Sequence, residues 1–248
     1  MDKIRIGTMG WSYDFWIGNF YAPTTDASDY LAEYSKHFDT VEVDNTFYRI
    51  PSEATIRRWF EQTPSGFVFS LKFPRVITHV KMLKDCEQET RVFIKHVSGL
   101  DDKLGPLLLQ FPPTFKKNQL PLLENFLTSL PQKRRVAVEV RNRELLNDDF
   151  YSILRRNEVA LAWVEGPLIP STYVATADFL YIRWEGDRRK VNGLLGKVET
   201  DKGDEIKKWV DRIEQLLDNS MEIFGYFSKY YSGHPPTDAK QLLKLLQT

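Results

Sequence analysis

Short segments of this chain alternate apolar and charged positions with a period of two, and this pattern predicts β-strands. In segments 41–44, 69–72, 136–141 and 180–185, one parity consists of Val, Ile, Leu, Phe and Trp. The other parity ends in Glu, Asp, Lys or Arg. Because successive side chains of a strand point to opposite faces, the apolar set can pack under helices while the charged set points elsewhere. The pattern therefore indicates a layered fold whose interior is polar at one end.

Strand and helix patterns alternate along the whole sequence. The expected strands are 4–10, 40–47, 67–73, 106–111, 135–141, 159–165, 179–185 and 222–228, and the expected helices are 28–37, 52–62, 86–97, 119–130, 147–156, 203–218 and 237–246. Parallel neighbouring strands need crossover connections, so the alternation predicts an α/β fold, a (β/α)8 barrel of the TIM type. Segment 166–177 holds two prolines and predicts a loop, which makes the barrel irregular around strands six and seven.

A doubly wound open sheet is the structural alternative. Its dinucleotide fingerprint, G-x-G-x-x-G at the start of a helix, is absent here, because the glycines at 7 and 10 lead into aromatic residues. The length of 248 residues is close to the typical size of a single barrel, about 250 residues. Residues 1–248 are therefore expected to form one TIM-barrel domain.

Composition adds few constraints on function. The chain has 34 Lys and Arg against 34 Asp and Glu, so no global field attracts it to nucleic acid or to anionic lipid. Cys86 is the only cysteine, which excludes an intrachain disulfide and a cysteine-built zinc site. We find neither a secretion signal nor an apolar run long enough to span a membrane. These features predict a protein of the reducing cytoplasm with no membrane partner.

The charged parity points to a site at the carboxyl ends of the strands, where barrel enzymes place their functional groups. The catalytic candidates are Glu42, Lys72 and Glu139 from strand ends, together with His79 from the loop after the third strand. The predicted substrate-binding residues come from the same strand ends and from two aromatic loops: Trp11, Tyr13, Asn45, Tyr48, Gln110, Arg141, Arg183, Glu185 and Tyr226.

Two purely structural interpretations compete with this site. Interior charges of both signs could simply neutralise one another, and the aromatic residues after the first strand could simply close the barrel end. Removing charges from water costs several kcal/mol per ion unless the pairing geometry is very good. A single buried pair is compatible with a structural role, whereas a larger set at one end favours a solvated pocket.

Six ordered blocks along nearly the whole chain resemble the domain-of-unknown-function 72 family, also called YecE-like. They read GTMGWSY at 7–13, FYAP at 20–23, VEVDNTFYRIP at 41–51, FSLK at 69–72, LGPLLLQFPP at 104–113 and VEVR at 138–141. The resemblance implies a TIM-type barrel and brings no settled biochemical activity. It weakens in the last third, where the family's usual Arg-x-His-Gly reads Arg183-Trp184-Glu185-Gly186 and the family's Tyr-x-Tyr-Phe-Asn-Asn-Asp is replaced by the sequence at 225–231.

Metal-free acid–base or electrostatic catalysis fits the candidate residues best. Lys72 with Arg141 or Arg183 can hold a phosphate or a carboxylate. Glu42 and Glu139 are expected to differ in pKa according to their distance from a cation, which would give one acid and one base. No cofactor is expected. A Mg²⁺ or Mn²⁺ ion on the carboxylates is an open alternative, whereas Zn²⁺ is disfavoured because the strand ends carry no imidazole.

The sequence supports two functions of different class. The first is an enzyme, a hydrolase, lyase or isomerase that acts on a small anionic substrate at the barrel mouth. The second is a non-catalytic protein that binds a ligand or nucleic acid, with a phosphodiesterase acting on nucleic acid between the two. Aromatic residues beside basic ones suit single-stranded nucleic acid, but the net neutrality of the chain does not favour it. The oligomeric state is left open.

Overall fold

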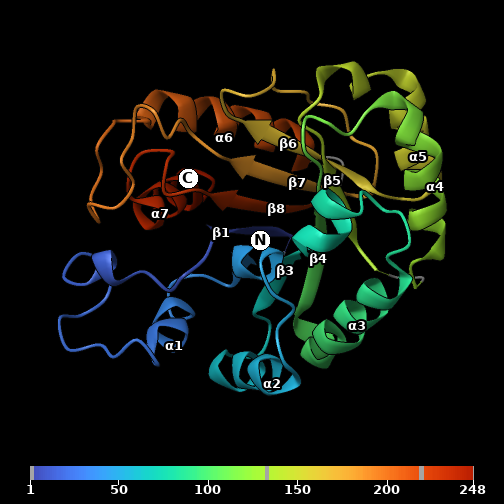
Figure 1. The fold of residues 1–248 in the computed structure, drawn as a ribbon. Helices are drawn as coiled ribbons and strands as arrows, with labels where there is room; N and C mark the ends of the chain where they lie inside the picture. Colours follow the sequence, from blue (N-terminus) through green and yellow to red (C-terminus); the bar gives the residue numbers. More distant parts are fainter. Residues whose placement is uncertain (1–2, 132–133, 218–220, 248) are drawn as a thin grey trace.

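Eight parallel strands form a nearly closed barrel in the computed structural model, which describes residues 3–131, 134–217 and 221–247 (Figure 1). Neighbouring strands are hydrogen-bonded in the order β1-β8-β7-β6-β5-β4-β3-β2. The fold is α/β and the architecture is a TIM-like barrel, which confirms the predicted fold class. The strands are β1 (Ile4–Thr8), β2 (Thr40–Val43), β3 (Val68–Lys72), β4 (Leu104–Gln110), β5 (Val136–Glu139), β6 (Ala160–Glu165), β7 (Phe179–Trp184) and β8 (Glu222–Phe227).

The barrel closes less completely between β1 and β2 than elsewhere. A single bridge joins these strands near the mouth, where the Gly10 amide donates to the Glu42 carbonyl oxygen at 2.8 Å. Deeper in the seam, the Tyr34 hydroxyl accepts a hydrogen bond from the Thr8 amide at 2.9 Å and donates to the Thr40 carbonyl at 3.0 Å. One side chain thus satisfies backbone groups that a continuous strand ladder would otherwise pair.

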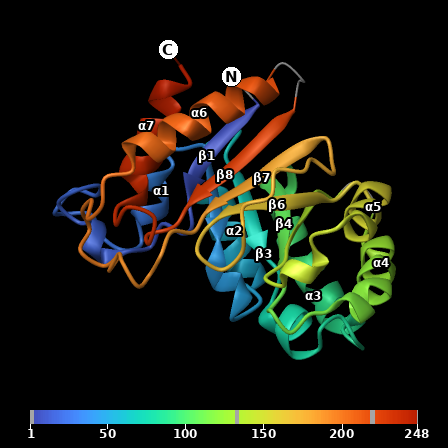
Figure 2. The ribbon, with the colours of Figure 1, turned by 90° about the horizontal axis from the view of Figure 1, so that it is seen from above.

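Helices surround the strands. They are α1 (Tyr30–Tyr34), α2 (Glu53–Gln62), α3 (Glu87–Val97), α4 (Leu120–Ser129), α5 (Asp148–Arg156), α6 (Gly203–Leu217) and α7 (Pro235–Leu245). Figure 2 shows α6 and α7 beside β1 and β8, with α4 and α5 on the opposite side of the barrel. No helix forms in segment 166–178 between β6 and β7, so the predicted irregularity is confirmed. The last residue of the expected helix 203–218 lies outside the described residues.

The predicted extension of the second strand to residue 47 is wrong. Strand β2 ends at Val43, and Asp44–Phe47 forms a 3-10 turn. The buried Thr46 hydroxyl contacts two carbonyl oxygens, that of Val43 at 2.9 Å and that of Lys72 at 2.6 Å. This side chain ties the turn to the end of β3 and directs the chain away from the barrel axis.

The buried apolar side chains divide into an outer and an inner set. The outer set joins strands to helices: Phe69 stacks on Trp59 of α2, and Trp184 packs edge-on against Trp209 of α6. The inner set is smaller and includes Tyr181 and Tyr226, whose rings lie 5.4 Å apart. The predicted alternation between a helix-facing apolar parity and an inward-facing parity is thereby confirmed.

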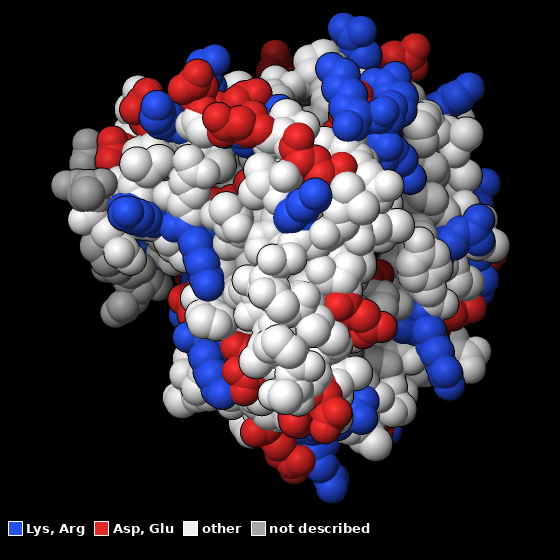
Figure 3. Space-filling model, turned by 90° about the vertical axis from the view of Figure 1, so that its left-hand side faces the viewer, with Lys and Arg blue, Asp and Glu red and all other residues white. Residues whose placement is uncertain are grey.

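Among the described residues, no helix is both long and apolar enough to cross a membrane. Figure 3 views the molecule from the side on which the loops after β1 and β7 and helix α7 lie. Lys, Arg, Asp and Glu are found mainly around the margin of this face, and its centre is uncharged.

Candidate functional site

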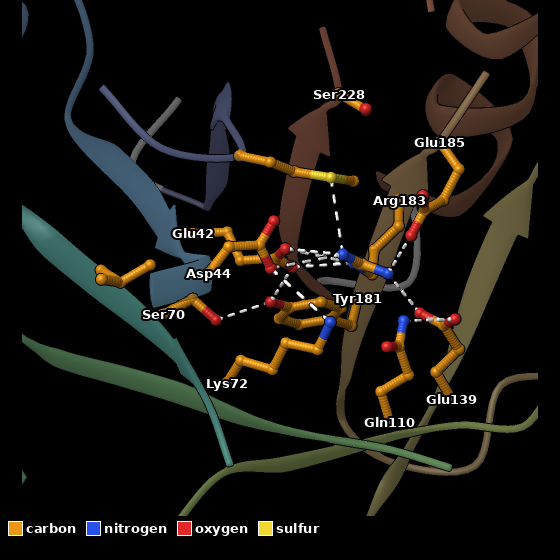
Figure 4. A network of polar contacts seen from close by, with 12 residues as sticks. Glu42, Asp44, Ser70, Lys72, Gln110, Glu139, Tyr181, Arg183, Glu185 and Ser228 are labelled. Carbon is orange, nitrogen blue, oxygen red and sulfur yellow. Dashed lines mark hydrogen bonds and ion pairs between the residues drawn. The ribbon is translucent and has the colours of Figure 1, made fainter. Parts of the chain in front are cut away.

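The carboxyl ends of β2, β5 and β7 converge on the guanidinium group of Arg183 (Figure 4). Its Nε donates to Glu42 Oε2 at 2.9 Å and its Nη2 to Glu42 Oε1 at 2.8 Å, which forms a bidentate ion pair. Its Nη1 donates to both Glu139 and Glu185, and Nη2 also faces the sulfur of Met9 at 3.5 Å. All five N–H donors of Arg183 therefore have a partner.

Side-chain exposure increases from the centre of the cluster to its edge. Arg183, Glu42 and Glu139 are at most 2% exposed, whereas the side chains of Glu185 and Arg141 are 19% and 23% exposed. Arg141 Nε donates to Glu139 Oε1 at 3.1 Å, and its Nη2 lies 3.5 Å from Glu185 Oε1. Arg141 therefore extends the network towards solvent.

Gln110 secures the buried side of Glu139. Its Nε2 donates to Glu139 Oε1 at 2.7 Å, and the two residues lie opposite each other in the register of β4 and β5. Lys72 is the least tightly held cation of the cluster. Its Nζ lies 3.8 Å from Asp44 Oδ1 and 4.6 Å from the centre of the Phe47 ring.

Four carboxylates and three cations make up the cluster: Glu42, Asp44, Glu139 and Glu185 with Lys72, Arg141 and Arg183. Full ionisation would leave one excess negative charge (four against three) in a site of low polarity. Burial raises the pKa of Glu42 to about 7 against the opposing attraction of Arg183. Burial would also raise the pKa of Glu139, but Arg183, Arg141 and Lys72 outweigh it and lower the pKa to about 2.

A chain of hydroxyl groups lies below the cluster. The Ser70 hydroxyl donates to the Pro106 carbonyl oxygen at 2.7 Å and lies 2.7 Å from the Tyr181 hydroxyl. The Tyr181 hydroxyl donates to Glu42 Oε2 at 2.6 Å. This hydrogen bond favours the ionised carboxylate and so opposes the effect of burial on the pKa of Glu42.

A cavity of about 420 Å³ opens beside the exposed edge of the cluster. Glu139, Arg141 and Glu185 line it, together with the loop after β6, residues 186–189 and Tyr230. Glu42 and Arg183 lie behind these residues and do not line the cavity. A molecule in the cavity would therefore meet Glu139, Glu185 and Arg141 first.

His79 approaches the cluster from the other flank, on a π-helical turn (Val76–Val80) after β3. Its Nδ1 lies 2.9 Å from the Thr78 hydroxyl, and its ring packs edge-on against Phe47. Partial burial and the nearby charges of Lys72 and Arg141 lower the pKa of His79 to about 4. The imidazole is therefore neutral at pH 7. Single π-helical turns occur frequently at functional sites.

The structure places four predicted substrate-binding residues apart from the cluster. Trp11 packs against Trp59 and Phe69, because the chain leaves β1 on the helix-facing side. Tyr226 is fully buried below the charged layer, where its hydroxyl contacts that of Thr40 at 2.9 Å. Tyr48 is 81% exposed, and Asn45 is exposed on the same turn. None of these four residues contacts the charged cluster among the described contacts, and their predicted role in substrate binding stays a prediction.

The remaining predicted residues do gather near the mouth, although their roles stay predictions. Tyr13 lies at the rim, where its hydroxyl donates to the Met9 carbonyl at 2.8 Å and Lys229 lies above its ring. Sequence reasoning missed Tyr181, which shares the inward parity of Arg183 and could have been selected on that signal. It also missed Tyr230 and Arg188, because the loops that carry them have no periodic pattern.

The described residues contain no group of three His, Cys, Asp or Glu side chains arranged to hold a metal ion. The carboxylates of β2, β5 and β7 instead aim their oxygens at Arg183. Glu165, another acid at a strand end, accepts a hydrogen bond from Trp209 Nε1 and so points towards α6. These contacts favour direct pairing of acid with cation over a shared metal ion.

Fold and site together define a TIM-like barrel protein with a buried network of acids and arginines at the carboxyl ends of its strands. The chain belongs to the family described as "Protein of unknown function DUF72", whose model matches residues 5–248. The resemblance found in the sequence blocks is thereby confirmed.

Relatives support this placement. The chain is 37% identical over 139 residues to UPF0759 protein YecE of Escherichia coli K12. The match covers 56% of this chain and 48% of YecE, so the aligned region spans about half the length of that relative. Over 280 aligned positions it is 26% identical to UPF0759 protein YunF of Bacillus subtilis, covering 98% and 94% of the two chains.

Two solved structures resemble the barrel. The crystal structure of a DUF72 family protein from Thermotoga maritima matches with a TM-score of 0.84 at 26% identity, covering 99% of both chains. A DUF72 family protein from Enterococcus faecalis matches with a TM-score of 0.75 at 21% identity, covering 99% of this chain and 98% of that one. The second likeness shows the fold alone.

Proposed function

We propose that this protein is an enzyme that acts on a small molecule bearing a phosphate or a carboxylate at the carboxyl-terminal mouth of the barrel. The observation that carries the proposal is the convergence of Glu42, Glu139 and Glu185, from three different regions of the chain, on the buried Arg183. Burying ions costs several kcal/mol each even after relaxation. The layer immediately below holds the barrel together with tyrosines and apolar residues, so packing alone does not require these ions.

Glu139 is the general base in this proposal. Its low pKa, about 2, keeps it ionised at neutral pH, and it lines the cavity. Burial raises the pKa of Glu42, on the opposite side of Arg183, to about 7, so the two carboxyl groups titrate in different pH ranges. Pairs of titratable groups whose environments push their pKa values apart are typical of acid–base sites.

The other groups fit the same chemistry. Arg141 is close enough to the cavity to stabilise negative charge that develops on a substrate, and Glu185 orients it. The neutral His79 lies on a second flank beside Lys72, where its imidazole can accept a proton. A hydrolysis, an elimination or an isomerisation initiated by proton transfer would use these residues.

A ligand-binding protein without catalysis is the competing function, and nucleic acid is the competing ligand. The chain carries equal numbers of acidic and basic residues, and the face in Figure 3 mixes both signs around an uncharged centre. Tight binding to a phosphate backbone relies on many basic contacts. The distribution therefore supports a small molecule over a polynucleotide.

The test is a thermal-shift screen with phosphorylated and carboxylated metabolites, followed by NMR detection of turnover for each compound that stabilises the protein. We expect Glu139→Gln to abolish turnover and to keep the stabilisation, because the amide preserves the shape but not the base. Glu124→Gln, which removes an exposed carboxylate on α4 far from the mouth, is the matched control. Compounds that bind and stay unchanged in the wild type would show a binding protein instead.

A further inference from the structure

The two arginines of the cluster are poorly placed to hold the anionic group of a substrate by themselves. Arg183 uses all five of its donors within the protein, so an anion there would have to displace a carboxylate. Arg141 lines the cavity, but Glu139 and Glu185 flank it and would repel an anion. Recognition of the anion therefore needs a cation elsewhere on the cavity wall.

Arg188 is such a cation. It lines the cavity and is exposed, and its guanidinium carbon lies 5.4 Å from the centre of the Tyr230 ring. Lys229 Nζ lies 5.3 Å from the centre of the same ring. Among the residues that the structure describes, neither cation belongs to an ion pair. The neighbouring Arg189 differs, because it donates to Asp187 at 2.9 and 2.8 Å.

The geometry of Tyr230 makes Arg188 more than a solvated surface charge. A guanidinium held over an aromatic face keeps its planar donors directed outward, and less freedom is lost when it binds an anion in a bidentate way. Lys229 is also held by rings, with its Nζ 5.3 and 5.6 Å from the centres of Tyr13 and Phe15. The cavity wall therefore carries one positioned cation, Arg188, and a second, Lys229, lies behind the wall against the ring of Tyr230.

The wall of the cavity beside Arg188 is apolar. Val164, Pro167, Leu168 and Ile169 line it, and the Leu168 side chain is largely exposed. An exposed leucine in the wall of a cavity is buried again when an apolar group enters, and this contributes to affinity. A purely polar ligand would leave this surface without a partner.

We propose that the cavity takes an amphipathic anion, a phosphate or carboxylate attached to an apolar or aromatic body. Arg188 binds the anionic group at the rim, with Lys229 adding to the local positive potential. The apolar body lies along Leu168 and Ile169, and its far end reaches Glu139 and Glu185. The position of the reacting end at Glu139 and Glu185 rests on the proposed function. Binding of the anionic group by Arg188 and of the apolar body by the cavity wall does not.

The test measures binding of phenyl phosphate and of benzoate by titration calorimetry, with inorganic phosphate and phenol as the two half-ligands. We expect one of the aryl anions to bind the wild type more tightly than either half-ligand. Arg188→Ala should weaken that binding at least tenfold, a loss of about 1.4 kcal/mol, and Arg188→Lys should recover part of it. Arg156→Ala, which removes an arginine on α5 far from the cavity, should leave the affinity within twofold.

A second variant tests the apolar wall. Leu168→Ser should weaken binding of the aryl anion and leave binding of inorganic phosphate unchanged. Because the Leu168 side chain is largely exposed, the variant should keep its fold, which circular dichroism checks. Binding that does not depend on Arg188, equal affinity for inorganic phosphate and phenyl phosphate, or no binding of either aryl anion at millimolar concentration overturns the inference. Failure of the proposed function looks different: binding stays dependent on Arg188, but no compound is turned over.

Discussion

The titration of Glu42 gives the sharpest prediction, because burial raises the pKa of this carboxyl in spite of the hydrogen bonds that it accepts from Arg183 and Tyr181. The pKa of this carboxyl rises from 4.5 to about 7 on folding, chiefly through burial. A group whose pKa is raised in the folded state binds its proton more tightly there. Its contribution to stability is therefore complete below pH 4.5 and is lost as the pH rises towards about 7.

The magnitude follows from the size of this shift. One proton more in the folded state than in the unfolded state gives a slope of about 1.4 kcal/mol per pH unit. Over the window from pH 4.5 to about 7, the loss amounts to about 3 kcal/mol of unfolding free energy. Glu42 is fully buried, so solvent does not screen this effect.

Glu42→Gln imitates the protonated form and removes the titration. The amide oxygen can accept from Arg183 Nη2, whereas an amide nitrogen at the Oε2 position faces Arg183 Nε and loses that hydrogen bond. We expect the variant to lose this part of the pH dependence between pH 5 and 7. Its stability at pH 8 should therefore lie closer to that of the wild type than at pH 5, by about 3 kcal/mol.

Urea unfolding at pH 5, 6, 7 and 8 measures both quantities, with Glu124→Gln as the control for loss of an ordinary carboxylate. A variant that is destabilised by several kcal/mol at every pH would refute the reasoning, since it would show that Arg183 depends on an ionised Glu42. An unchanged slope in the variant would assign the pH dependence to other groups.

Two further predictions concern the architecture of the site. Arg183→Met should lower the unfolding free energy by about 3–5 kcal/mol, because it leaves Glu139 and Glu185 without a cation beside a buried apolar side chain. Calorimetry should show Tm lowered by about 10 °C, with Arg156→Met as the control. An unchanged Tm would show that the network is not needed for folding. Gly7→Ala should destabilise the protein by about 1–3 kcal/mol in urea, because a Cβ there would lie 2.3 Å from the Thr40 carbonyl oxygen and force β1 away from β2. Gly203→Ala, at the start of α6, is the matched control and should change stability by less than about 0.5 kcal/mol; equal effects at the two positions would contradict a tight seam.

Local patterns were enough to predict the barrel. The period-two alternation in β2, β3, β5 and β7 identified the strands and separated the helix-facing side chains from the inward-facing ones. The prolines of segment 166–177 indicated the missing helix. These features depend on a few neighbouring residues, so they can be recognised without knowledge of the fold.

The strand ends and loops were predicted less well. Parity alone could not show that Tyr226, the register partner of Arg183, directs its hydroxyl to Thr40 and not to the charged cluster, because the Thr40 hydroxyl comes from another strand. It could not show that Thr46 ends β2 either, since the carbonyl oxygen of Lys72 that helps to hold it comes from another strand. The chain after β1 carries Trp11 to the outer layer for a similar reason: its partners, Trp59 and Phe69, are distant in sequence.

The sequence by itself determined which residues are inward-facing and ionisable, because alternation is a property of each strand. Only the tertiary structure decided how these groups share charge. Arg183 pairs with three carboxylates, from β2, from β5 and from the residue after its own strand; burial raises the pKa of Glu42; and Arg188 forms no ion pair among the described residues. Pairing and desolvation depend on distances between segments that are far apart in the chain, and those distances exist only once the barrel has closed.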